Sequence, residues 1–322
     1  MKVSECNKYF NLKYVTQWFS FAAMKTQNPL HPVLLGLALF SVSAQADNLD
    51  TAKIETIIGL KGAINTNEGV FKITVPRNDV KIAVDGWTMP PFMGLGTWAA
   101  FTQGKMGDAM VMGDTVLFQD EVNPVMSVAL DNGLSVTALH NHFFFDEPKV
   151  YFMHIGGEGS VENLASAVRK VWDKIKEVRA ANPQPVTTFG NVPMPARNSI
   201  TGKTIEDVTG VKGQASGGMF KVTIGRTAKM METEVGKEMG VNTWAAFAGT
   251  DDNALVDGDF AVREKELQPV LKSLRHDGIT IVAIHSHMTD ENPRTLFLHY
   301  WGRGKAVDLA KALKSALANQ SK

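Results

Sequence analysis

Cysteine is almost missing from this chain, because Cys6 is the only one among 322 residues. A single thiol excludes an intrachain disulfide and a cysteine-based zinc finger. An excess of charge of one sign is missing too, since 33 basic residues balance 33 acidic ones. A nucleic-acid binder needs a basic face for phosphate contacts, so we expect no nucleic-acid partner. The hydrophobic content of 44% excludes a largely disordered chain.

Long hydrophobic runs are missing except for a short one near the N-terminus. Lys25 is followed by an apolar run over residues 33–40 and then by Ala44-Gln45-Ala46. This order is typical of a secretory signal peptide rather than of a membrane span. We therefore expect residues 1–46 to be an N-terminal extension and signal peptide, cleaved near Ala46. The mature chain would then lack Cys6 and any transmembrane segment, and would be periplasmic or secreted.

The rest of the sequence contains a tandem repeat. The segment Thr97-Trp98-Ala99-Ala100-Phe101 recurs as Thr243-Trp244-Ala245-Ala246-Phe247, and residues 113–167 match residues 258–312 without a gap. Between the copies lies a stretch rich in Pro, Asn and Thr, which is typical of a linker. We expect a first repeat at residues 47–181, a linker at 182–203 and a second repeat at 204–322.

Each copy shows the same succession of strand and helix patterns. Alternating segments at residues 71–75 and 220–224 predict strands, and amphipathic segments at 121–130 and 266–275 predict helices that end at Gly133 and Gly278. Apolar strands are expected at 134–142 and 279–287, further strands at 150–155 and 295–300, and closing helices at 161–178 and 306–317. The fold class is therefore α+β, a tandem duplication of a mixed-sheet domain with two helices per copy on one face.

Histidines carry the chemistry that the sequence suggests. Six of them occupy matched positions in the two copies: His140, His142 and His154, and His285, His287 and His299. Residues i and i+2 of a strand share a face, so each H-x-H pair presents two imidazoles together. The third histidine lies on the next strand, and a tight hairpin would place His154 opposite Ala138, one rung from His140. The triplets predict sites for a divalent transition metal, Zn or Cu, either one per copy or one shared.

Matched carboxylates accompany the histidines. Asp146 and Glu291 align in the loop between the two histidine strands, where each could be a fourth metal ligand, a second-shell acceptor or a polar turn residue. Glu121 and Glu266 begin the amphipathic helices. There each could act as a general base, provided that a parallel crossover brings it to the histidine edge, or could simply favour the helix dipole.

Two further features have simpler interpretations. The pairs Gly113-Asp114 and Gly258-Asp259 are interpreted as turn positions. Met106, Met110 and Met112 cluster in the first copy, but Asp251, Leu255 and Asp257 replace them in the second. Because the methionines are not duplicated, we interpret them as core filling rather than as a soft copper(I) site.

These motifs resemble a known family. The doubled Thr-Trp-Ala-Ala-Phe segment, the A-x-H-x-H strands and the later Phe-x-His with Gly-x-Gly look like the DUF1259 family, also called the LppY/LpqO family, over essentially the whole mature chain. The resemblance implies an exported protein of uncharacterised function. The chain departs from the lipoprotein members because it has no acylatable cysteine at the expected cleavage site. A fainter similarity to the JAMM metalloproteases lacks the serine and aspartate spacing of their motif.

Three functions fit these observations. The first is an exported metal-binding protein that acts in metal handling or in metal-supported ligand binding. The second is a metal-dependent hydrolase that acts on a cell-envelope substrate, with Glu121 or Glu266 as base. The third is a module that binds an envelope polymer or peptide without metal. An open coordination position beside Glu121 would favour the second, four protein ligands that fill the site would favour the first, and dispersed histidines would favour the third. Expected partners are a metal ion and a cell-envelope small molecule or peptide.

Overall fold

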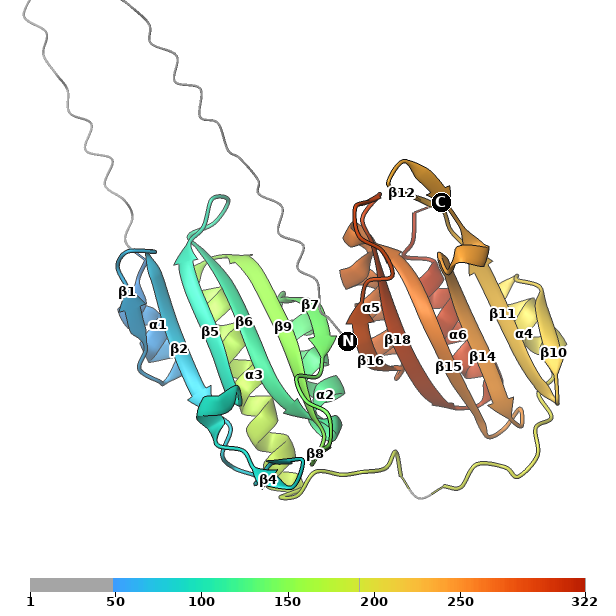
Figure 1. The fold of residues 1–322 in the computed structure, drawn as a ribbon, viewed down its shortest axis with the longest axis horizontal. Helices are drawn as coiled ribbons and strands as arrows, with labels where there is room; N and C mark the ends of the chain where they lie inside the picture. Colours follow the sequence, from blue (N-terminus) through green and yellow to red (C-terminus); the bar gives the residue numbers. More distant parts are fainter. Residues whose placement is uncertain (1–48, 191, 322) are drawn as a thin grey trace, which may run out of the picture. The chain divides into compact units, whose positions relative to one another are not determined.

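The computed structural model describes residues 49–190 and 192–321 (Figure 1). The expected N-terminal extension and signal peptide lie outside these residues, so cleavage and export stay predictions. Within the described part of the chain, no helix is long and apolar enough to cross a membrane.

The first repeat contains three α-helices and nine strands. Its helices are α1 (Thr51–Ile58), α2 (Gln119–Asp131) and α3 (Val161–Ala181). Its main sheet is formed by β1 (Ala63–Asn65), β2 (Val70–Pro76), β5 (Gly96–Gln103), β6 (Ala109–Phe118), β7 (Ser135–His140) and β9 (Val150–Gly159). A small second sheet is formed by β3 (Ala83–Val84), β4 (Trp87–Thr88) and β8 (Asp146–Glu147), and a 3-10 turn, η1 (Pro91–Met93), precedes β5.

The second repeat has the same order of elements. Its helices are α4 (Gly202–Thr209), α5 (Leu267–His276) and α6 (Ala306–Leu317). Its main sheet is formed by β10 (Gly213–Ser216), β11 (Met219–Gly225), β14 (Asn242–Gly249), β15 (Ala254–Arg263), β16 (Thr280–His285) and β18 (Thr295–Gly304). A small sheet is formed by β12 (Ala228–Met230), β13 (Thr233–Val235) and β17 (Glu291–Asn292), and the 3-10 turns are η2 (Lys237–Met239) and η3 (Glu264–Glu266).

The two main sheets join into one sheet of 12 strands. The order is β1-β2-β5-β6-β9-β7 followed by β16-β18-β15-β14-β11-β10, so the second half mirrors the first. The halves meet where β7 pairs with β16 through Leu139 and Ile284. Chain order and strand order together show that the histidine strands β7 and β16 lie at the centre of the joined sheet.

Helices cover one face of this sheet and leave the histidines on the other. Apolar side chains at alternate positions of the strands, such as Val111, Met153 and Leu298, pack in one large core with residues of the helices. Figure 1 shows α3 running behind β5 and β6. On the opposite face, residues of the small sheets form two minor cores, one around Phe152 and one around Phe297. The histidines lie beside these minor cores.

The expected fold class is confirmed, and the structure adds two details. Each repeat has a third helix, α1 or α4, at its start. The sequence of α1, TAKIETII, is short and rich in β-branched residues, so its helical propensity is weak, and packing of Ile54 and Ile58 against the core holds it. The main sheet is antiparallel at each named pairing rather than mixed, because β9 inserts between the parallel strands β6 and β7.

Reciprocal side-chain amides join the two repeats. The amide of Asn123 on α2 bonds the backbone N–H and C=O of Ile281 at 2.7 and 3.0 Å. The amide of Gln268 on α5 bonds the N–H and C=O of Val136, each at 2.9 Å. Asn123 and Gln268 hold matching positions in the two copies, as do Val136 and Ile281. The junction is therefore two-fold symmetric in its contacts, as in an isologous dimer interface.

The double replacement Asn123→Ala with Gln268→Ala is expected to lower the free energy of unfolding. Each change leaves backbone groups of a central strand without partners, at a cost of about 1–3 kcal/mol per site. Urea denaturation measures the loss. Asn319→Ala is the control, because this exposed amide bonds only the carbonyl of Ser315 in its own chain segment. Equal midpoints for the double variant and the control would contradict a stabilising role.

Candidate metal centre

Three neighbouring strands build the histidine cluster of the second repeat. Asp259 on β15 pairs with His299 on β18, and His299 pairs with Ala283 on β16. His285 is the last residue of β16, and His287 follows in the loop. The open face of the sheet therefore carries one carboxylate and three imidazoles side by side.

The geometry of this cluster fits a metal ion. The Nε2 atoms of His285 and His287 lie 3.1 Å apart, and His287 Nε2 lies 3.3 Å from Asp259 Oδ2. One ligand atom from each of the three residues falls within 4.8 Å of the others. Two ligand atoms about 2.1 Å from a tetrahedral zinc ion are about 3.4 Å apart, so the observed spacings are those of ligands that share a metal.

Backbone carbonyls orient two of the rings. His287 Nδ1 donates to the carbonyl oxygen of Gly240 at 3.2 Å, and His299 Nδ1 donates to that of Gly258 at 3.3 Å. Donation from Nδ1 leaves Nε2 of each ring with a free lone pair, which is the usual second-shell arrangement of a metal-binding histidine. His287 also stacks on Phe297, with ring centroids 3.5 Å apart. The ring of His287 is thus held with its ligating atom toward Asp259 and His285.

Burial shifts the pKa values of two residues of the cluster. Burial, with smaller contributions from His299 and His287, lowers the pKa of His285 to about 4, so this imidazole is neutral and can ligate at neutral pH. Burial also raises the pKa of Asp259, while the neighbouring histidines oppose the rise. Asp259 Oδ1 and His285 Nδ1 are buried without a hydrogen-bond partner in the described part of the chain. A buried polar atom without a partner calls for an explanation, and a bound ion is one.

The first repeat has the same residues in a more open arrangement. Asp114 pairs with His154, and their Oδ2 and Nε2 atoms lie 3.9 Å apart. The ring of His140 lies 5.1 Å from that of His142 and 5.2 Å from that of His154, centroid to centroid. Burial and the neighbouring His140 lower the pKa of His142. Asp114 and the three histidines therefore lie close together, but their ligand atoms converge less closely than those of the second repeat.

The strand register agrees with the sequence, whereas one histidine lies elsewhere than expected. Ala138 is opposite His154, and His140 is opposite Phe152. β7 ends at His140, so His142 lies in the following loop rather than in the strand. Its ring folds back over Phe152, with centroids 3.3 Å apart. Contact with an aromatic ring of the minor core, not strand alternation, places the second imidazole of each pair.

Asp146 and Glu291 lie in the small sheets, where they hold turns together. Asp146 accepts from the backbone N–H of Val150 at 2.7 Å and from Lys149 Nζ at 3.1 Å. Glu291 accepts from the N–H of Thr295 at 3.2 Å. Neither belongs to the converging group of Asp259, His285 and His287. Their contacts match the turn role that the sequence left open.

Glu121 and Glu266 are held by arginines. Glu121 is fully buried and accepts two bonds from Arg77, at 2.6 and 2.8 Å, and one from the N–H of Phe118 at 2.8 Å. Arg226 holds Glu266 in the same way at 2.5 and 3.0 Å. Although burial opposes ionisation, hydrogen bonds from Arg226 and Ser321 lower the pKa of Glu266 to about 2. A carboxylate of that kind is a weak base, so these contacts favour the structural alternative at the helix start.

Asp114 and Asp259 are site residues that the sequence interpretation missed. The sequence pattern predicts turn positions for both, but each lies within a strand and faces the histidines. The signal was present, because the Gly-Asp pair is identical in both copies. Glycine followed by aspartate is typical of turns, and only the strand pairing shows that the carboxylate points toward His154 or His299.

Met106, Met110 and Met112 of the first repeat are not core residues. Met110 and Met112 on β6 are 40% and 54% exposed, and Met106 in the loop before β6 is 90% exposed. The interpretation as core filling was therefore wrong. Val111, between them, faces the large core, so alternation turns Met110 and Met112 to the histidine face.

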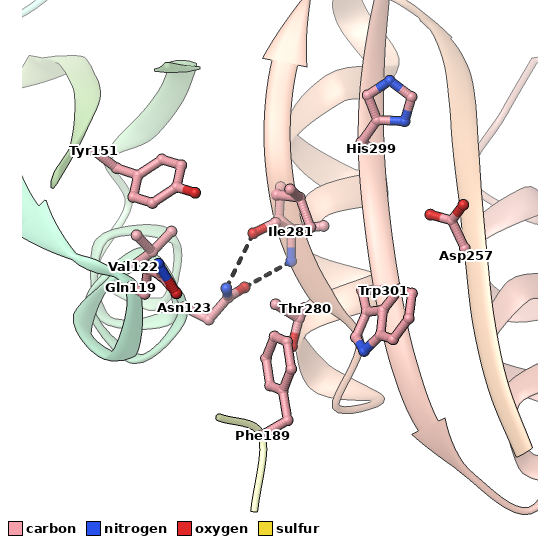
Figure 2. A pocket seen from close by; sticks show the side chains of 11 residues that line it. Gln119, Val122, Asn123, Tyr151, Phe189, Asp257, Thr280, Ile281, His299 and Trp301 are labelled. Atoms are coloured by element: carbon pink, nitrogen blue, oxygen red, sulfur yellow. Dashed lines mark hydrogen bonds between the residues drawn. The ribbon is translucent and has the colours of Figure 1, made fainter. Parts of the chain in front are cut away.

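A cavity of about 420 Å³ adjoins the second histidine cluster (Figure 2). Its lining includes the aromatic side chains of Tyr151, Phe189 and Trp301, and the charged side chain of Asp257. His299 lines the cavity and also stacks on His285, with ring centroids 4.8 Å apart. The cavity therefore contacts the second histidine cluster through His299.

Comparisons with known proteins identify a family. The profile of the Domain of Unknown Function (DUF1259) matches residues 52–174 and 203–319, which confirms two tandem copies. The search of curated proteins finds no match. A solved structure, the double-ringed trimeric shell protein of the RMM microcompartment, is similar at 11% identity over 77% of this chain and 92% of that chain, with a TM-score of 0.17. At that score the likeness carries no argument.

Proposed function

We propose that each of the two repeats binds a divalent transition metal, Zn(II) or Cu(II). The chain belongs to the DUF1259 family and carries the family domain twice. The observation that carries the proposal is the convergence of Asp259, His285 and His287 in the second repeat. Asp114, His140 and His142, with His154, form the matching set in the first. Imidazole and carboxylate ligands suit both metals.

The cavity beside His299 supports a role in ligand binding at the metal. Three protein ligands leave a coordination position open on a four-coordinate ion. The adjoining cavity has the volume and the mainly apolar lining of a site for a small molecule. The second repeat would then hold a metal that a small molecule of the cell envelope completes. Metal handling needs no such cavity, so the cavity favours metal-supported binding among the roles considered.

Export is part of the same proposal. The support is the leader pattern that ends at Ala46. Histidine and aspartate ligands also need no reducing compartment, because neither forms disulfides. An exported protein meets metal ions and envelope molecules outside the cytoplasm. The periplasm or the extracellular space is therefore the proposed location.

Elemental analysis of the native protein tests this function. The chain is isolated without tag or chelator from the exported fraction of its native cells, and its intact mass shows whether it begins at Asp47. We expect two equivalents of zinc or copper per chain, or two equivalents taken up on titration. Protein that neither contains nor binds zinc, copper or nickel would overturn the proposal. A full-length mass, or its absence from the exported fraction, would overturn the location alone.

A further inference from the structure

The histidine clusters of the two repeats differ at one pair of neighbouring positions. In the first repeat Met112 on β6 is opposite Gly156 on β9. In the second repeat the matching residues are Asp257 on β15 and Trp301 on β18, also opposite each other. Each pair lies two residues along the strands from the aspartate–histidine pair of its own repeat, and therefore on the same face of the sheet. The histidines are thus duplicated, while the side chains beside them are not.

In the first repeat this divergence places one thioether, that of Met112, diagonally across from the imidazole of His154. Met112 and Asp114 share a face of β6, and Asp114 is opposite His154, so Met112 is the diagonal neighbour of His154 across the pair of strands. Diagonal neighbours are within reach of long side chains. Gly156 has no side chain, and a Cβ there would meet only the carbonyl oxygen of Val111 at 3.6 Å. The position directly opposite Met112 on β9 therefore holds no side chain and is open.

The exposure of these methionines calls for an explanation. Methionine is among the residues most often buried, yet Met110 and Met112 both lie on an open face of the sheet. Beside them Asp114 Oδ1 is buried without a partner in the described part of the chain. Thioether sulfur is a soft ligand that prefers copper(I), whereas zinc and copper(II) sites are built from imidazole and carboxylate. The first repeat carries both kinds of donor on the same face of the adjacent strands β6 and β9.

From this placement we propose that the site of the first repeat binds copper(I), with the sulfur of Met112 joining His140 and His154 as ligands. The second repeat, where Asp257 and Trp301 replace the soft donor and the open space, keeps a preference for divalent ions. The inference rests on the proposed metal-binding function and makes it specific. One chain would hold two sites with different preferences for the oxidation state of the metal.

Competition for copper(I) tests the inference. The full chain is titrated anaerobically against a colorimetric copper(I) chelator, in a His285→Ala/His287→Ala background that leaves only the first site. Met112→Leu is expected to weaken copper(I) binding by at least about tenfold while leaving zinc binding unchanged, because leucine keeps the apolar volume and removes the sulfur. Met239→Leu is the matched control, since Met239 is also exposed but lies in the second repeat.

The possible outcomes separate this inference from the proposed function. Copper(I) affinity that is equal in Met112→Leu and in the control would overturn the inference while zinc binding upholds the proposed function. Parallel losses of zinc and copper(I) affinity in Met112→Leu would also overturn it, because a general disturbance of the site would explain them. Absence of all metal binding in the background variant would overturn both for the first repeat.

Discussion

Replacement of both His285 and His287 by alanine is expected to remove one of the two metal equivalents and to leave the other. The two Nε2 atoms are 3.1 Å apart, and His287 is the residue that connects the pair to Asp259. The double change leaves only Asp259 and His299 of the four cluster residues. Loss of outer-shell partners alone weakens metal sites by about 10–100-fold. Loss of two direct ligands should exceed about a hundredfold, measured by zinc titration of the folded variant.

The control for this experiment is His276→Ala. His276 is an exposed histidine at the end of α5, bonded to Asp277 and outside the cluster. Its removal should leave both equivalents bound. Loss of both equivalents in the double variant would point to one site shared by the repeats, and unchanged stoichiometry would exclude His285 and His287 as ligands. The converse variant, His140→Ala with His142→Ala, should empty only the first site.

Replacement of Glu121 by glutamine is expected to destabilise the protein severely without emptying either metal site. Glu121 is completely buried, and the guanidinium of Arg77 binds both of its oxygens. Arg179, itself buried, adds a contact of 2.7 Å to the same carboxylate. Removing the negative charge leaves Arg77 with only Asp79 and Arg179 with only Asp120 as ion-pair partners. Loss of the buried central carboxylate of this cluster costs up to about 3–5 kcal/mol. Urea denaturation measures the loss, and zinc titration at low temperature measures the metal content.

Glu162→Gln is the matched control for Glu121→Gln. Glu162 pairs with Lys53 at the surface, where both side chains are about half exposed. Surface pairs contribute about 0–1 kcal/mol, so this variant should unfold close to the wild-type midpoint. A loss below 1 kcal/mol for Glu121→Gln would contradict the assigned structural role. Loss of a metal equivalent by the folded variant would instead show that Glu121 contributes to the metal site.

The sequence predicted the repeat, the histidine set and the register of the strands, because each of these follows from local pattern. Identical spacing in two copies pointed to His140 and His154, and strand periodicity placed His154 opposite Ala138. The position of His142 was beyond periodicity, since it depends on contact with Phe152 from another strand. The weak helix α1 was missed for a related reason: packing, not propensity, forms it.

Long-range pairing decided the residues that the sequence could not assign. The side chain of Asp259 points to His287 because β15 and β16 flank β18, an arrangement that no local pattern encodes. Glu121 met the pattern of a helix-start acid, and only the fold shows that Arg77 and Arg179 converge on it. Core-facing and open-facing methionines look alike in sequence, which explains the wrong interpretation of Met112.

The reciprocal amide contacts of Asn123 and Gln268 have a consequence for how the two halves can change. A symmetric homodimer must alter both copies of a site at once, because one gene encodes both. A covalent tether removes that constraint and also holds the halves at a local concentration in the millimolar range, so that even a small contact area keeps them together. The residues at these matched positions, Met112 and Gly156 in one repeat and Asp257 and Trp301 in the other, can therefore differ without weakening the association of the halves. One polypeptide can thus carry two different metal centres.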